Sequence, residues 1–198
     1  MSLMSLLSRL VAAVSFCGCC TAAVTSPTDL YAIPIITIDE KPYDLGQHRG
    51  QVILFVNVAS ECGFTGQYAG LQQVYVTYQT KGLTVIGVPS NDFGVLSGQE
   101  PGSNAEIKTF CSTKFKVTFP MMAKVAVKGK AMHPLYSFLT STAPGQPSVS
   151  WNFNKFLVGR DGKVISHFGS RVKPEDAELT KAIEAALAAP APAPASAP

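Results

Sequence analysis

Charged side chains are scarce in this chain of 198 residues: Asp, Glu, Lys and Arg make up 15% of it, against 46% for hydrophobic residues. The 16 basic residues are scattered and form no stripe or block, which argues against nucleic acid as a partner. The sequence has no internal repeats, and its longest apolar run falls short of the roughly 20 residues that a membrane-spanning helix needs. The apolar content suffices for a core, and the length suits one domain with tails.

The N-terminal stretch has the pattern of a secretory signal. Arg9 precedes an apolar run from Leu10 to about Val24, which closes on small residues. We therefore expect residues 1–24 to be a cleaved signal peptide and the protein to be exported, either to a periplasm or to the exterior. The alternatives are an uncleaved membrane anchor and a lipid-modified cysteine at Cys19 or Cys20.

Removing this signal changes the cysteine count. Of five cysteines, three lie within the first 24 residues, which leaves Cys62 and Cys111. In an oxidising exported compartment, two cysteines indicate either one structural disulfide or one redox pair. Both fall within residues 25–189, which we expect to form the folded domain. Residues 190–198, which alternate Ala and Pro with one Ser, are expected to form an extended, disordered tail.

The domain alternates strand and helix patterns, and Ser103 with Glu106 forms a Ser-x-x-Glu capping box at the start of one helix. The pattern predicts a single α/β domain with a mixed central sheet flanked by helices. In chain order the predicted elements are a strand over 33–38, a buried strand over 52–58, a helix with Tyr68, Leu71, Tyr75 and Tyr78 on one face, a buried strand over 83–88, a helix from Ser103, a strand over 123–127, a short helix over 134–139, a hairpin of 156–158 and 164–168 around Asp161-Gly162, and a last helix from Pro174 with Leu179, Ile183 and Leu187 on its apolar face.

Cys62 lies in the loop between a central strand and the next helix, where reactive groups gather in such sheets. Backbone N–H groups and the positive end of a helix dipole favour the thiolate, which is the nucleophilic form. The alternative is a buried, inert cysteine. A dithiol oxidoreductase would need a second cysteine three positions on, where this chain has Thr65. The isolated positions of its three histidines (His48, His133 and His167) argue against a metal site.

Four segments in order resemble the motifs of the glutathione peroxidase family. The resemblance covers about Ile35 to Leu187 and implies a thioredoxin-like fold. The matching segments are Asn57-Val58-Ala59-Ser60-Glu61-Cys62-Gly63-Phe64-Thr65, then 89–94 with 98–102, then Val117-Thr118-Phe119-Pro120, and finally Trp151-Asn152-Phe153 with Lys155-Phe156-Leu157.

The resemblance implies a role for five residues. Cys62 matches the peroxidatic position, Gln99, Trp151 and Asn152 match the side chains around it, and Cys111 matches the resolving cysteine of thioredoxin-dependent members. Amide and indole N–H groups are donors that can stabilise a thiolate or a leaving oxygen. The alternatives are a solvated Gln or Asn, a Trp in a core or interface, and a buried helical cysteine.

The chain departs from the family pattern at several points. Ser90 stands where many relatives have cysteine, which leaves Cys111 as the thiol partner, and Asp92 stands where they have glutamine. Residues 95–97 resemble an insertion just before Gln99. The short segment over 136–151 lacks the longer loop of tetrameric relatives and favours a monomer.

These observations predict a thiol peroxidase that acts in the response to oxidative stress. The family resemblance implies hydrogen peroxide and organic or lipid hydroperoxides as substrates, and glutathione or a thioredoxin-like protein as reductant. A Cys62 sulfenic acid would condense with Cys111 or meet an external thiol. Because a disulfide needs Cα atoms within roughly 7 Å, we expect the helix around Cys111 to unwind locally. The sequence indicates no metal or organic cofactor. The alternatives are a redox sensor or relay and a structural or metal-handling thioredoxin-like module.

Overall fold

The computed structural model describes residues 27–95 and 98–191. The predicted signal peptide lies outside the described residues, as do residues 192–198 of the predicted tail. None of the helices in the described ranges combines the length and the apolar character that crossing a bilayer requires.

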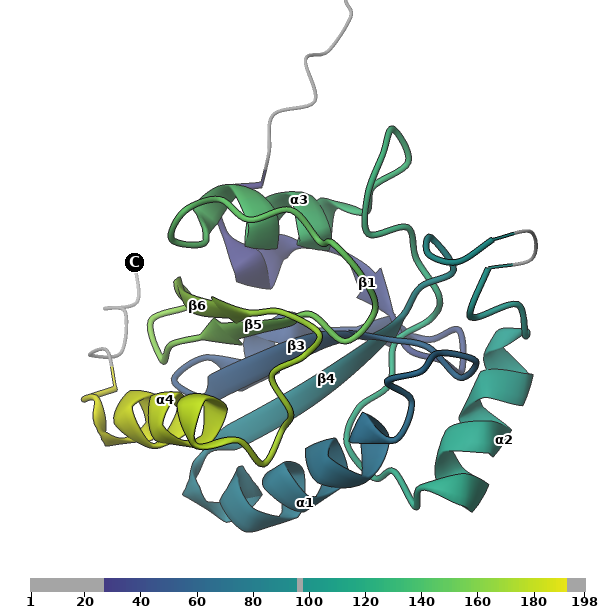
Figure 1. Ribbon diagram of the computed structural model, residues 1–198. Coiled ribbons are helices and arrows are strands. Elements are labelled where there is room, and N and C mark those ends of the chain that lie inside the picture. Colours follow the sequence, from purple (N-terminus) through teal and green to yellow (C-terminus); the bar gives the residue numbers. More distant parts are fainter. Residues whose placement is uncertain (1–26, 96–97, 192–198) are drawn as a thin grey trace, which may run out of the picture.

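A four-stranded mixed sheet in the order β4-β3-β5-β6 forms the centre of the domain (Figure 1). β3 (Val52–Val58) pairs in parallel with β4 (Leu83–Pro89) on one side and antiparallel with β5 (Lys155–Val158) on the other. β5 continues into an antiparallel hairpin with β6 (Val164–Phe168). The two predicted buried strands and the predicted hairpin are confirmed.

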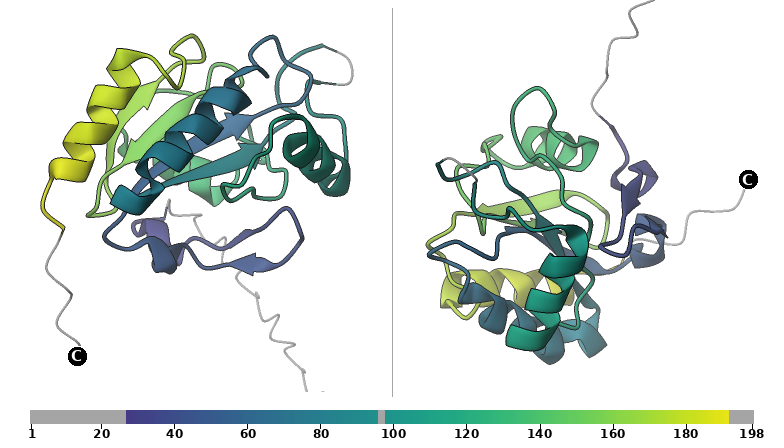
Figure 2. Two further views of the ribbon diagram at one scale, coloured as in Figure 1. Left: turned by 90° about the horizontal axis from the view of Figure 1, so that it is seen from below. Right: turned by 90° about the vertical axis from the view of Figure 1, so that its right-hand side faces the viewer.

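Helices cover both faces of this sheet, so the predicted fold class is confirmed. α1 (Gln67–Tyr78) and α4 (Ala177–Ala188) lie on one face, α3 (Pro134–Thr142) lies on the other, and α2 (Asn104–Lys114) stands beyond the β4 edge (Figures 1 and 2). The remaining elements are short: the strands β1 (Ile35–Ile36) and β2 (Pro42–Tyr43), and the 3-10 helices η1 (Leu30–Ala32), η2 (Leu45–His48) and η3 (Gln79–Lys81).

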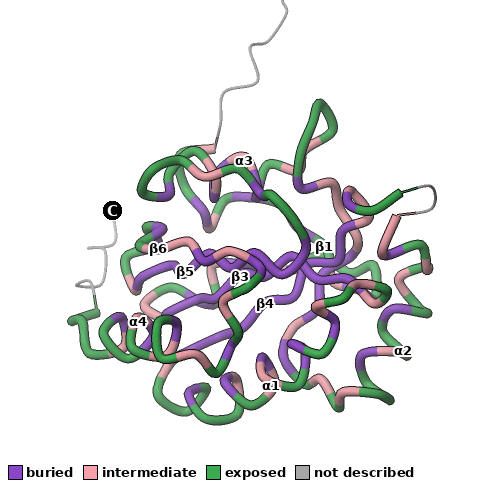
Figure 3. The backbone as a smooth tube through the Cα atoms, viewed as in Figure 1, coloured by how far each residue is buried: buried purple, intermediate pink, exposed green. Residues whose placement is uncertain are grey.

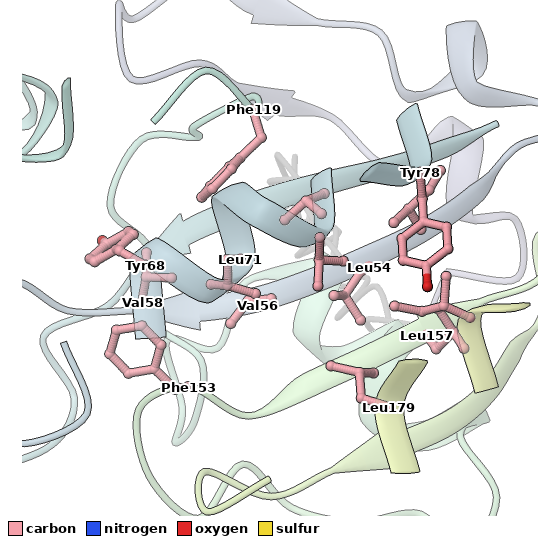
Figure 4. Packing of buried hydrophobic residues seen from close by; sticks show 14 of the residues in the cluster. Leu54, Val56, Val58, Tyr68, Leu71, Tyr78, Phe119, Phe153, Leu157 and Leu179 are labelled. Atoms are coloured by element: carbon pink, nitrogen blue, oxygen red, sulfur yellow. The ribbon is translucent and has the colours of Figure 1, made fainter. Parts of the chain in front are cut away.

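The alternation of side chains along β3 divides the core into two clusters. Leu54 and Val56 join Leu71 of α1 and Leu179 of α4 on one face (Figure 4). Ile53 and Phe55, which alternate with Leu54 and Val56 along the strand, point to the other face, where they pack with α3. Every residue of β3 and β4 is buried, which explains why both strands appear as continuous apolar runs (Figure 3).

The predicted strand over 123–127 is wrong. This stretch lies along the sheet edge, but its backbone bonds change partner: Ala123 N–H donates to the Ile36 carbonyl and Val125 N–H to the Pro89 carbonyl. Met121 and Met122 just before it form only isolated bridges. The chain therefore lacks one continuous partner strand, and β-branched composition alone does not make a ladder.

Two other boundaries differ from the prediction. The strand expected over 33–38 is reduced to β1, because η1 precedes it and an isolated bridge follows it. The last helix begins at Ala177, not at Pro174. The Asp176 carboxylate accepts from the Lys173 N–H over 2.7 Å and so closes a separate turn around Pro174.

Candidate active site

The turn that carries Cys62 is fixed by one hydroxyl. β3 ends at Val58 and α1 begins at Gln67, and between them the Thr65 Oγ1 accepts the Cys62 N–H over 3.0 Å. The same hydroxyl lies 2.7 Å from the Cys62 carbonyl and 3.0 Å from the Ala59 carbonyl, to which it donates. Thr65 is buried, so the residue that replaces a second cysteine here serves as the internal tether of the loop.

The Cys62 sulfur is half-buried and accepts the Phe64 N–H over 3.4 Å. An amide pointing at sulfur next to the start of a helix stabilises the thiolate. The thiol is free, as is that of Cys111. Cys62 can therefore meet a small oxidant without a rearrangement of the fold.

Two of the predicted side chains contact each other. The Asn152 Nδ2 donates to the Gln99 Oε1 over 2.7 Å, and Asn152 is fully buried. The Glu61 N–H donates to the Gln99 carbonyl over 3.0 Å, which attaches this pair to the Cys62 turn. Within the described part of the chain, Asn152 Oδ1 is a buried acceptor without a partner, so it is available to accept a hydrogen bond from a bound molecule.

Trp151 is placed beside this pair, with its ring at the surface. Its side chain is 37% exposed and packs on the Phe93 ring at 5.5 Å. Its carbonyl accepts from the side-chain amides of Asn57 and Asn154, over 2.9 and 2.8 Å. In the described residues, none of the side chains of Gln99, Trp151 and Asn152 bonds directly to the Cys62 sulfur. In this state the sulfur accepts a hydrogen bond from the backbone N–H of Phe64.

Cys111 lies on α2 and is only 2% exposed. Burial raises the pKa of its thiol to about 11, while the neighbouring Tyr68 hydroxyl lowers it and the Glu100 carboxylate raises it further. The thiol is therefore protonated at neutral pH in this state. It forms part of the wall of a cavity of about 550 Å³, together with apolar side chains such as Tyr75 and Phe119.

Sequence reasoning missed a buried acid beside the turn. Glu100 is fully buried and accepts the Ser60 hydroxyl, and its backbone N–H donates to Asn91 over 2.6 Å. Burial raises the pKa of the Glu100 carboxyl, although the Ser60 hydrogen bonds and Lys124 lower it. Its neighbour Gln99 attracted the functional assignment, and only the fold shows that Glu100 points inward.

Asn57 and Lys155 were also missed, although both carry a recognisable signal. Asn57 is a polar residue inside the buried run of β3, and its side chain bonds to the Trp151 carbonyl and the Asn154 N–H. Lys155 opens β5 and is fully buried. A polar or charged residue inside an apolar strand pattern needs internal partners, and that requirement could have drawn attention to both.

Each histidine bonds to neighbouring groups. His48 bonds to the Tyr43 hydroxyl over 2.7 Å, His133 accepts the Leu135 N–H at the start of α3, and His167 bonds to Asn154 over 2.8 Å. Across residues 27–95 and 98–191, no group of three or more His, Cys, Asp or Glu side chains is placed to hold a metal ion.

The chain is similar to several known proteins. The family model described as glutathione peroxidase matches residues 30–140. The hydroperoxy fatty acid reductase gpx1 of Synechocystis sp. is 45% identical over 155 residues, which cover 74% of this chain and 90% of the reductase. The crystal structure of Trgpx in apo form matches with a TM-score of 0.67 at 37% identity, over 84% of this chain and 100% of that one.

A more distant structure supports the fold alone. A thioredoxin-family thiol:disulfide interchange protein from Chlorobium tepidum matches with a TM-score of 0.59 at 17% identity, over 83% of this chain and 99% of that one. The predicted thioredoxin-like fold and the predicted resemblance to the glutathione peroxidase family are confirmed by these matches.

Proposed function

Because the chain belongs to the glutathione peroxidase family, we propose that the Cys62 thiolate is the group that attacks the O–O bond of a hydroperoxide. Membership of this family makes the chain a cysteine-dependent peroxidase, and the proposal concerns the residues that perform the reaction. The observation that carries it is the Cys62 turn: a half-buried sulfur faces the Phe64 N–H, and the Gln99–Asn152 pair is attached to Glu61, the residue before Cys62.

The first step forms an S–O bond and breaks the O–O bond. Sulfur gives its electron pair to the distal oxygen and becomes a sulfenic acid, while the other oxygen leaves as water or an alcohol after it takes up a proton. Negative charge develops on that leaving oxygen. Amide and indole N–H groups of Gln99, Asn152 and Trp151 are the donors that would stabilise it.

The second step transfers the oxidation to Cys111. Its thiol condenses with the sulfenic acid, which forms an S–S bond and releases water. Because Cys111 is buried on an intact α2, we expect the helix to unwind locally before the sulfurs meet. A dithiol, or two molecules of a monothiol, then restores both cysteines by exchange and is itself oxidised to a disulfide. The cysteine pair favours a protein dithiol as this reductant, with glutathione as the alternative.

The surroundings of the turn favour organic hydroperoxides besides hydrogen peroxide. Val95 is 83% exposed and Trp151 is 37% exposed, and both add apolar surface to the two loops that carry Gln99 and Asn152. The Synechocystis relative is named a hydroperoxy fatty acid reductase, and we extend that substrate class to this chain. The export signal, the monomeric state and a role in the response to oxidative stress are proposed on the sequence patterns described above.

The assignment is tested with Cys62→Ser and Cys111→Ser. One equivalent of hydrogen peroxide is added to each reduced protein, the oxidised cysteines are mapped by mass, and peroxide consumption is followed with thioredoxin and with glutathione. Cys62→Ser is expected to consume no peroxide. Cys111→Ser is expected to accumulate the Cys62 sulfenic acid and to lose turnover with thioredoxin. Undiminished turnover in Cys62→Ser would show that the assignment of the nucleophile is wrong.

A further inference from the structure

The turn that carries Trp151 and Asn152 contains a strained residue. Phe153 has a φ of 60°, which is sparsely populated for a bulky side chain and persists only where the surroundings hold it. Its N–H donates to the Asn57 carbonyl over 2.6 Å, and its ring lies edge-on to Tyr68 at 5.5 Å (Figure 4). Phe153 is fully buried, so its carbonyl needs a hydrogen-bond donor from within the protein.

The side-chain ammonium of Lys155 supplies that donor. Its Nζ donates to the Phe153 carbonyl over 2.9 Å, to the Gln67 Oε1 over 2.6 Å and to the Val172 carbonyl over 2.5 Å. Lys155 is fully buried, and it forms no ion pair within the described residues. All three donor hydrogens are therefore used on neutral oxygens. Burial of an ammonium without a carboxylate carries a desolvation penalty that an apolar side chain at this position would avoid.

The three acceptors belong to three separate segments. Gln67 is the first residue of α1, directly after the Cys62 turn, and its own amide donates to the Ser170 carbonyl over 2.7 Å. Val172 belongs to the segment between β6 and α4. The ammonium thus joins the start of α1, the strained turn and the β6–α4 segment at one point.

We propose that Lys155 is a positioning residue for peroxide reduction, whose ammonium holds the strained Phe153 carbonyl against Gln67 and so fixes Asn152 and Trp151 relative to the Cys62 turn. This inference rests on the proposed roles of Cys62, Asn152 and Trp151. Lys155 does not touch the reacting atoms, and it acts through the carbonyl of Phe153, the residue that follows Asn152.

The charges around Lys155 make the contact sensitive to pH. Burial lowers the pKa of its ammonium to about 8, while Asp176 and Glu175, just before α4, raise it. His167 on β6 faces the same region, and its pKa is lowered by burial and then by the Lys155 charge. A neutral amine has two hydrogens, so above pH 8 one of the three acceptors loses its donor and the hold on the turn weakens.

The test compares Lys155→Met with two matched controls. Lys163→Met makes the same change at an exposed position of the same hairpin, and Leu157→Ala removes buried volume from β5 without touching the ammonium. The readout is the second-order rate constant for oxidation of Cys62 by hydrogen peroxide, divided by the rate of its alkylation by iodoacetamide. The division cancels changes in the thiolate fraction.

Lys155→Met is expected to lower this ratio by about ten-fold or more, whereas both controls stay within about two-fold of the natural chain. The proposal is overturned if Lys155→Met also stays within that range, or if Leu157→Ala falls as far.

If Lys155→Met does not fold, the Gln67→Glu variant tests the proposal instead. Its carboxylate keeps the ammonium charged, so the fall of the ratio above pH 8 should move to higher pH, and an unmoved fall or no fall overturns the proposal. Failure of the proposed function is separate, because it appears as peroxide consumption by Cys62→Ser.

Discussion

The side-chain amide of Asn152 donates to the Gln99 Oε1 over 2.7 Å, although 53 positions separate the two residues. The bond joins the loop after β4 to the turn before β5, and both lie beside the end of β3 that carries Cys62. Because the Asn152 Nδ2 is used in this contact, the Asn152 Oδ1 is left as a buried acceptor that has no partner within the described residues.

Asn152→Ala is expected to slow oxidation of Cys62 by about 100-fold, because it removes a preorganised donor from the leaving oxygen and frees the Gln99 side chain. The measurement is the rate of thiol loss after rapid mixing with hydrogen peroxide. Ser150→Ala, at an exposed position two residues earlier, is the control and should react at the rate of the natural chain. A rate for Asn152→Ala that matches the control would remove Asn152 from the reaction.

The two cysteines should differ in the pH at which iodoacetamide alkylates them. Because burial raises the pKa of the Cys111 thiol to about 11, this thiol stays protonated at pH 8 and reacts only as the pH approaches that value. Timed treatment with iodoacetamide followed by peptide mass mapping is expected to label Cys62 first. Addition of denaturant should bring Cys111 into reaction at pH 8. Equal labelling of both thiols in the native protein at pH 8 would contradict the buried position of Cys111.

The capping box of α2 should control the resolving step. Ser103 accepts the Glu106 N–H and Glu106 accepts the Ser103 N–H, so Ser103→Ala should lower stability by about 1 kcal/mol. If α2 must unwind before Cys111 reacts, that loss should speed disulfide formation by up to about five-fold. The assay is acid quench and mass analysis after one equivalent of peroxide. Ser112→Ala, exposed on the same helix, is the control, and a slower disulfide step in Ser103→Ala would argue against unwinding.

Glu100→Gln should change the pH dependence of stability. The folded state raises the pKa of the Glu100 carboxyl mainly by burial, so the folded protein binds this proton more tightly than the unfolded chain does. The group therefore contributes stability that grows as pH falls through the raised pKa toward the unfolded value, and that contribution is absent at neutral pH. Urea unfolding at pH 7 and pH 5 is expected to show a smaller gain on acidification in Glu100→Gln. An unchanged difference between the two pH values would contradict the raised pKa.

The parts of the fold that could be predicted from the sequence are those with a local signal. The run over 52–58 matches β3 at both ends, and the Ser-x-x-Glu pattern places the start of α2 because the cap is made within four residues. The segment over 123–127 contains two valines, but its backbone bonds go to three separate partners, Ile36, Pro89 and His133. Pairing of that kind is decided by the tertiary structure, so the local pattern predicts a ladder that does not form.

The same distinction applies to the site. The position of Cys62 after a buried strand is a local feature, whereas the Asn152–Gln99 bond and the Ser60–Glu100 bond join distant segments. Only the resemblance of motifs pointed to Gln99 and Asn152. Lys155 at the start of an apolar run is a local signal that this residue needs internal partners. Two of its three acceptors, Gln67 and Val172, lie on distant segments, so only the fold identifies them.

Trp151 is the one tryptophan of the chain, and the structure puts it on the turn next to Asn152 with its ring against Phe93. Its backbone carbonyl is held by Asn57 and Asn154, so the indole is fixed to the site while part of it faces solvent. The protein consequently carries its own optical probe. Intrinsic emission excited near 295 nm comes from this single ring, and rearrangement of the turn during the catalytic cycle can be followed in real time without a label.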